Sequence, residues 1–158
     1  MPRGRGDFPV NKTAAVGISR ESVGETWRLA LRGGPAEVTL DRAALTGMPQ
    51  TTARLPIACV EGWSTEQTWS GVRLAELACI AGVPALRSAR VISLQRGGAF
   101  GRATLQANQI RDPEALLALR VNGTDLPLDH GYPARIIVPA LPGVHNTKWV
   151  AAIEFEAG

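Results

Sequence analysis

The chain has 158 residues with 45% hydrophobic content, enough for one globular domain with its own core, and this composition argues against disorder. Its apolar runs fall well short of the roughly 20 residues that a membrane-spanning helix needs, and its first residues lack the apolar segment of a signal peptide. The net charge of +3 comes mostly from singly scattered arginines, and aromatic residues make up only 5%. Because this pattern offers neither a basic stripe nor a base-stacking platform, we expect no nucleic-acid partner.

Hydrophobic periodicity and turn residues divide the chain into many short segments. The predicted strands are residues 27–31, 37–40, 55–60, 89–94, 118–121, 134–138 and 149–155. The predicted helices are residues 42–45, 73–81 and 113–117, the first and last with Asp41 and Asp112 as N-caps. Asn122-Gly123 is the strongest short-range hairpin signal in the chain, and a polar loop is predicted around Trp69.

Short strands that outnumber short helices predict an α+β fold, rich in mixed or antiparallel sheet. We see no internal repeat and no second-domain boundary, so residues 1–158 are predicted to form one domain in which residues 1–8 are flexible. The first 25 residues are polar and glycine-rich and are expected to wrap the surface.

The two cysteines restrict the metal chemistry that the residues alone suggest. Cys79 falls on the predicted helix 73–81 among apolar residues and is predicted to fill the core. Cys59 ends an apolar strand just before Glu61-Gly62, where a thiol is either buried filler or accessible for chemistry. The sequence has no Cys-x-x-Cys, Cys-x-x-Cys-His or His-x-x-x-His motif, so structural zinc, iron–sulfur and covalent haem are poorly supported.

Six ordered motifs lead to a family resemblance. They are Val10-Asn11, Cys59-Val60-Glu61-Gly62-Trp63-Ser64, Trp69-Ser70-Gly71-Val72, Val121-Asn122-Gly123, His130-Gly131-Tyr132-Pro133-Ala134-Arg135 and Lys148-Trp149-Val150. In this order they resemble the molybdopterin-binding domain of the sulfite oxidase family of molybdenum enzymes. Within that family the chain is most similar to bacterial members such as the catalytic subunit of periplasmic methionine sulfoxide reductase. The resemblance runs from about Asp7 to Glu156.

The resemblance implies an oxidoreductase that transfers an oxygen atom at one molybdenum held by a pterin dithiolene. Cys59 is then the metal ligand and the catalytic residue, since soft thiolate ligation suits such a centre. The implied cofactor-binding residues are Asn11, Gln95, His130, Arg135, Asn146, Thr147 and Lys148, with Ser93 as the alternative to Gln95. Arg135 and Lys148 offer the forked guanidinium and compact ammonium with which proteins bind phosphate.

The other residues near these motifs receive supporting roles from the same resemblance. Asn146 and Thr147 are expected to contribute mainly backbone contacts. Trp63 and Trp69 are expected to wall the pocket, and Glu61 to orient the loop behind the thiolate.

The sequence departs from the sulfite-oxidising members directly after Cys59. Those members carry arginines there, whereas this chain has Val60, Glu61 and Gly62. A carboxylate beside the metal repels an anion, so we expect a small S-oxide or N-oxide as substrate in place of sulfite. Arg54 and Arg96 remain other sources of positive charge.

Electron transfer is expected to involve more than this domain. No haem domain is recognised, so we expect a separate electron-transfer partner or a further domain of the polypeptide. We interpret the chain as a monomeric fragment of a longer bacterial protein, membrane-associated or extracytoplasmic, with a membrane region outside this chain. The alternative is a non-catalytic cofactor-binding or scaffold domain of a larger membrane-associated redox protein.

Overall fold

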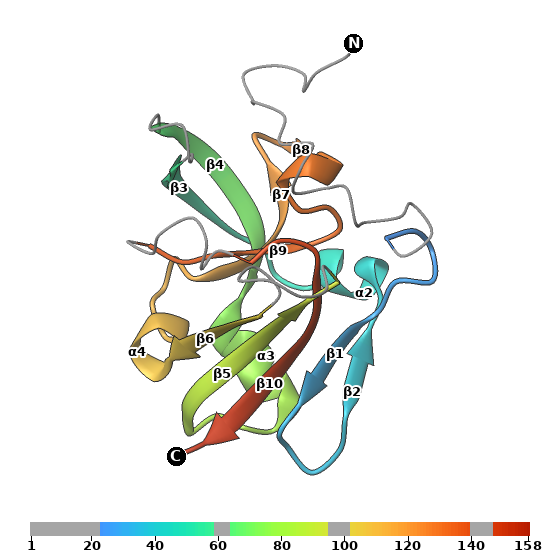
Figure 1. Ribbon diagram of the computed structural model, residues 1–158, viewed down its shortest axis with the longest axis vertical. Coiled ribbons are helices and arrows are strands. Elements are labelled where there is room, and N and C mark those ends of the chain that lie inside the picture. Colours follow the sequence, from blue (N-terminus) through green and yellow to red (C-terminus); the bar gives the residue numbers. More distant parts are fainter. Residues whose placement is uncertain (1–22, 59–63, 95–101, 140–146) are drawn as a thin grey trace.

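The computed structural model describes residues 23–58, 64–94, 102–139 and 147–158 (Figure 1). The elements are β1 (Leu29–Arg32), β2 (Val38–Leu40), α2 (Arg42–Thr46), β3 (Thr51–Ala58), β4 (Ser64–Arg73), α3 (Leu74–Ala81), β5 (Leu86–Ser93), β6 (Arg102–Gln106), α4 (Ala107–Ile110), β7 (Leu116–Val121), β8 (Thr124–Asp125), the 3-10 turn η1 (Leu128–His130), β9 (Arg135–Ile137) and β10 (Val150–Ala157). No helix in these ranges has the length and apolar character to cross a membrane.

The described strands form two five-stranded sheets. The first has the order β2-β1-β10-β5-β6, and the second has the order β3-β4-β7-β8 with β9 also paired to β7. β1 and β10 pair in parallel, while the other pairings in the described part of the chain are antiparallel. The predicted α+β fold with mixed and antiparallel sheet is therefore confirmed.

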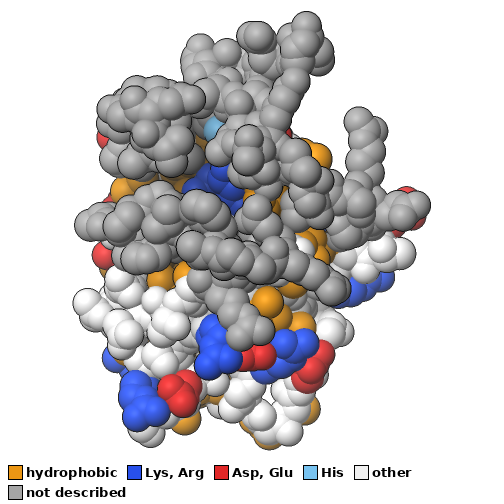
Figure 2. Space-filling view, in the orientation of Figure 1, with side chains coloured by type: hydrophobic (Ala, Val, Ile, Leu, Met, Phe, Trp, Pro, Cys, Tyr) orange, Lys and Arg blue, Asp and Glu red, His pale blue; other side chains and the backbone are white. Residues whose placement is uncertain are grey.

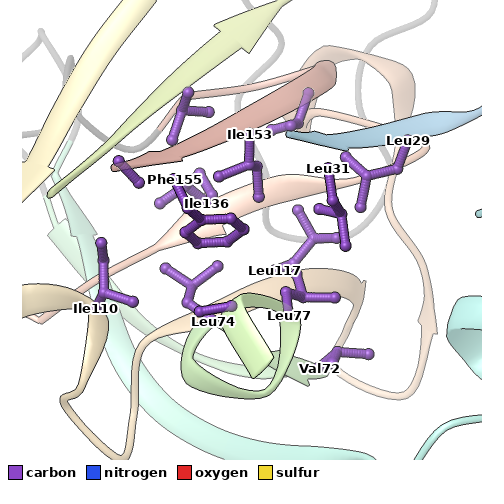
Figure 3. Packing of buried hydrophobic residues seen from close by; sticks show 14 of the residues in the cluster. Leu29, Leu31, Val72, Leu74, Leu77, Ile110, Leu117, Ile136, Ile153 and Phe155 are labelled. Atoms are coloured by element: carbon purple, nitrogen blue, oxygen red, sulfur yellow. The ribbon is translucent and has the colours of Figure 1, made fainter. Parts of the chain in front are cut away.

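The main hydrophobic core lies around α3, between the two sheets (Figure 3). It includes Leu74 and Leu77 of α3, Leu29, Leu31, Ile153 and Phe155 of the first sheet, and Leu117 and Ile136 of the second. Burying one such side chain contributes about 2 kcal/mol, so apolar contacts through α3 hold the sheets against each other.

The apolar face of α3 follows the helical period, and Cys79 does not lie on it. Leu74, Leu77, Ala78 and Ala81 are buried, whereas Cys79 is a free, exposed thiol. One residue along a helix turns the side chain by about 100°, which carries residue 79 away from the buried face. The prediction that Cys79 fills the core is wrong.

Several turn and cap residues have the roles that the sequence predicts. The Asp41 carboxylate accepts a hydrogen bond from the backbone N–H of Ala44 at 2.7 Å and caps α2, as predicted. Gly82 ends α3 with a φ of 87°. Asn122 and Gly123 both have positive φ, 52° and 84°, and turn β7 into β8. Such paired positive values are typical of tight hairpins.

Two sequence predictions of local structure are wrong, and one strand was missed. The region around Trp69 is not a loop but the strand β4, which pairs with β3 on one side and β7 on the other. Asp112 accepts a bond from the Glu114 N–H at 2.8 Å, yet a turn and then β7 follow in place of a helix. β6 was not predicted. In each case pairing with a distant strand decides the structure.

Opposite charges alternate on the outer face of the first sheet (Figure 2). Glu154 pairs with Arg32 at 3.2 Å and with Arg90 at 3.8 Å, and Glu156 pairs with Arg87 at 3.2 Å. Exposed pairs of this kind contribute little to stability, so their main effect is to neutralise the arginines locally.

Close approach of β4 and β7 predicts an effect of substituting Gly71. A Cβ at this position would lie 2.0 Å from the carbonyl oxygen of Leu117, so we expect Gly71→Ala to lower the free energy of unfolding by about 3 kcal/mol. Gly47→Ala is the matched control, because its Cβ would meet nothing closer than 3.4 Å. Urea unfolding measures both, and equal effects would contradict the close packing of the two strands.

Candidate functional site

Residues 147–149 run beside β9 and join it to the end of β5. The backbone N–H of Ile136 donates to the carbonyl oxygen of Thr147 at 2.8 Å. The Ser93 hydroxyl, at the end of β5, donates to the carbonyl oxygen of Lys148 at 2.7 Å. These bonds bring two predicted site residues, Thr147 and Lys148, together with Ser93, the alternative to Gln95.

Residues 148 and 149 also hold the turn η1. Lys148 Nζ donates to the carbonyl oxygen of Asp129 at 3.0 Å, and the Trp149 indole N–H donates to that of Leu128 at 2.8 Å. Trp149 has a φ of 53°, a conformation that costs a non-glycine residue about 1–3 kcal/mol. The contacts of these two side chains fix the turn that ends at the buried His130.

Arg135 is the buried charge of this region. Its side chain is 1% exposed, and Nη1 donates to the carbonyl oxygen of His130 at 3.3 Å. Nε donates to the carbonyl oxygen of Ile136 at 3.4 Å. Burial lowers the pKa of the Arg135 guanidinium to about 10, so it remains protonated at neutral pH. Removing a guanidinium from water is costly, and such costs concentrate at ligand sites.

Trp69 lies against this guanidinium and links it to another strand. The Arg135 Cζ lies 5.1 Å from the centroid of the Trp69 ring, and the Trp69 indole N–H donates to the carbonyl oxygen of Leu55 at 3.1 Å. Leu55 belongs to β3, the strand that precedes Cys59. Sequence reasoning assigned Trp69 to a pocket wall and missed this contact, because the mostly polar residues around Trp69 do not alternate with apolar ones as a strand signal requires.

The predicted site residues divide into two groups. His130, Arg135, Thr147 and Lys148 are described, and the structure brings them together around β9 and η1. Cys59, Asn11, Gln95 and Asn146 lie outside the described residues, as do Glu61 and Trp63. The roles given to them stay predictions. In the described chain Ala58 is paired with Ser64 across the β3–β4 hairpin, so residues 59–63 connect two paired strand ends.

The described residues suit an anionic ligand that is rich in hydrogen-bonding groups. Thr147 is 3% exposed, and its Oγ1 makes no hydrogen bond in the described structure. A buried hydroxyl without a partner costs free energy that a ligand can recover. Thr147 directly precedes Lys148, and its backbone carbonyl oxygen is bonded to Ile136 of β9, the strand that carries Arg135. A phosphate group fits such a combination.

A metal held by the described residues alone is not indicated. In the described part of the chain no three His, Cys, Asp or Glu side chains lie close enough together to hold an ion.

Comparison with known proteins identifies the family of this chain and its cofactor. The profile of the oxidoreductase molybdopterin-binding domain family matches residues 15–158. The chain belongs to this family. It is a molybdopterin-binding domain of the sulfite oxidase type, as the ordered motifs predicted, and its cofactor is molybdenum molybdopterin. The buried guanidinium, the ammonium and the unpartnered hydroxyl fit this cofactor, which ends in a phosphate.

The relatives of this molybdopterin-binding domain are both eukaryotic and bacterial. Human mitochondrial sulfite oxidase is 26% identical over 161 residues, which cover 84% of this chain and 29% of that protein. An Arabidopsis thaliana sulfite oxidase is 32% identical over 111 residues, which cover 58% of this chain and 28% of that protein. The Bacillus subtilis oxidoreductase YuiH is 31% identical over 150 residues, which cover 94% of this chain and 73% of that protein. The chain thus spans less than a third of the sulfite oxidases that it matches.

A solved structure supports the same fold. The sulfane dehydrogenase SoxCD from Paracoccus pantotrophus superposes on the molybdopterin-binding domain with a TM-score of 0.76 at 23% identity, covering 85% of this chain and 39% of that one. The likeness to methionine sulfoxide reductase in particular stays a prediction.

Replacing Arg135 with methionine tests the cost of the buried charge. Methionine keeps a long side chain without charge, so we expect the free energy of unfolding of the cofactor-free chain to stay unchanged or to rise by up to about 2 kcal/mol. The control Arg54→Met removes an exposed arginine that pairs with Glu66 at 2.9 Å. Urea unfolding measures both variants, and a large loss of stability in Arg135→Met alone would show that the guanidinium stabilises the fold.

Proposed function

We propose that this domain transfers an oxygen atom between molybdenum and a small substrate, with Cys59 as the thiolate that the protein supplies. The observation that supports a cofactor at this place most directly is the fully buried, protonated Arg135 at the start of β9. A protein that needed only a stable core would place an apolar side chain there. A buried cation is useful when an anionic group, here the phosphate of the pterin, arrives to pair with it.

Each described site residue has a distinct part in this proposal. Arg135 and Lys148 bind the phosphate, and the buried Thr147 hydroxyl supplies a further hydrogen bond. His130 binds the pterin through its side chain, and Ser93 orients the Lys148 backbone through the 2.7 Å bond to its carbonyl oxygen. Asn11, Gln95 and Asn146 complete the cofactor contacts as the family resemblance implies.

The metal end of the site depends on the β3–β4 hairpin. β3 pairs with β4 over its whole length, from Thr51 to Ala58, so the backbone that enters residue 59 is held by a continuous ladder. The Trp69 side chain then connects this hairpin to Arg135. The cofactor, when bound, supplies the two-electron redox change that accompanies oxygen-atom transfer, and the protein supplies position and exclusion of water.

The substrate that we propose is a neutral S-oxide or N-oxide. Val60-Glu61-Gly62 follows the thiolate, and a carboxylate there disfavours an anion such as sulfite. Arg54, one other source of positive charge, is exposed and paired with Glu66 on the hairpin. The named activity of the sulfite oxidases belongs to those proteins, of which this chain matches less than a third. We further propose that electrons come from a separate protein or domain.

The exchange of each cysteine for serine tests the role of Cys59. Wild type and both variants are made in a host that synthesises the cofactor. Turnover is followed with a reduced dye as electron donor for an S-oxide or an N-oxide, and with an oxidised dye as electron acceptor for sulfite. We expect reduction of an S-oxide or N-oxide by wild type and by Cys79→Ser, since Cys79 is exposed on α3. Cys59→Ser should lose more than about 100-fold in rate, because it removes the metal ligand.

Three outcomes of this experiment test the ligation by Cys59, the choice of substrate and the alternative of a scaffold domain. Equal activity of the two serine variants contradicts ligation by Cys59. Sulfite oxidation in preference to the oxides contradicts the substrate proposal. A wild-type chain that contains molybdenum but turns over none of the three substrates favours a scaffold domain.

A further inference from the structure

One arginine on α2 reaches the loop that joins His130 to Arg135. Arg42 Nη2 donates to the carbonyl oxygen of Leu119 in β7 at 2.7 Å, and Nε donates to that of Pro133 at 3.3 Å. A single planar guanidinium thus joins α2, the second sheet and the loop. Lysine cannot make this set of contacts, because its ammonium is a point charge.

The same guanidinium has two further partners. Its Cζ lies 4.8 Å from the centroid of the Tyr132 ring, and Nη2 pairs with the Asp125 carboxylate at 3.0 Å. The Arg42 side chain is only 20% exposed, so these contacts are partly shielded from water. Shielding strengthens cation–π contacts relative to those at the open surface.

The loop that Arg42 holds is folded tightly against Arg135. Gly131 has a φ of 114°, and a Cβ at this position would lie 2.8 Å from Cβ of Arg135. The carbonyl oxygen of His130 accepts from Arg135 Nη1 across the base of the loop. A displacement of Tyr132 or Pro133 therefore moves the carbonyl that orients the buried guanidinium.

We propose that Arg42 is a positioning residue for the molybdopterin site. It holds residues 131–134 against the second sheet and thereby fixes His130 and Arg135 where the cofactor meets them. In the sequence Arg42 was only one of the scattered arginines. The inference rests on the proposed cofactor role of Arg135, because Arg42 acts through that residue.

Arg120 provides a closely matched control. It pairs with the same Asp125 carboxylate, at 3.6 Å, but it lies on β7 and its side chain is half exposed. Both Arg42→Gln and Arg120→Gln remove one positive charge and one contact to Asp125. Of these two arginines, only Arg42 has a contact with the loop of residues 131–134 among the described residues.

The first measurement is the dissociation constant of purified molybdenum molybdopterin for the full chain. We expect Arg42→Gln to weaken binding by about 10-fold or more and Arg120→Gln by less than about 2-fold. Arg42→Lys should fail to restore binding, because lysine keeps the positive charge but lacks the planar set of donors of the guanidinium. Equal weakening by the two glutamine variants would overturn the proposal.

A double-mutant cycle separates positioning from general stability. If Arg42 acts through Arg135, then Arg42→Gln adds little further loss of binding in an Arg135→Met background. Full additivity of the two losses would mean that Arg42 acts independently, and would overturn the proposal.

Hydrogen exchange of the cofactor-free chain distinguishes failure of this inference from failure of the proposed function. We expect faster exchange in residues 127–137 for Arg42→Gln than for Arg120→Gln. A loop that exchanges equally in both variants overturns the positioning role, whatever the cofactor does. A wild-type chain that binds no molybdopterin overturns the proposed function, and with it the cofactor role given to Arg42.

Discussion

The buried guanidinium of Arg135 is the constraint on which the candidate site depends. A charge in this position is costly, and the fold offsets the cost with supports from several elements. The Trp69 ring of β4 covers the guanidinium, the His130 carbonyl at the end of η1 accepts a hydrogen bond, and β9 fixes the backbone. Arg42 of α2 holds the intervening loop from outside. These supports keep the cation in place for an anionic ligand.

The site also has a physical connection between its two ends. The Trp69 indole N–H is bonded to β3, which leads to Cys59, while the ring lies against Arg135. The thiolate that we propose as the metal ligand and the cation that we propose for the phosphate are thus related through one rigid side chain. A shift of β3 relative to β9 would disturb both, which explains why a wholly buried tryptophan is useful between them.

Sequence reasoning found the family and the fold class, because these depend on ordered local motifs. It also named as site residues four that the structure brings together around β9, and their roles stay predictions. It failed where a distant partner decides the structure. The polar residues of β4 show no strong strand signal, yet the strand is held from both sides by β3 and β7. The contact of Arg42 with Pro133 spans 91 positions, so no local pattern could have indicated it. Local apolar composition likewise suggested burial for Cys79, which the helical period places at the surface.

Cofactor content measures most directly whether the buried charge serves the cofactor. Molybdenum and pterin per chain should be determined for wild type, Arg135→Met and Arg54→Met after expression in a host that makes molybdopterin. If the buried cation serves to bind the phosphate, wild type and Arg54→Met should each contain close to one molybdenum and one pterin per chain. A folded Arg135→Met chain should lose most of both. Full cofactor content in Arg135→Met would contradict this role of the cation.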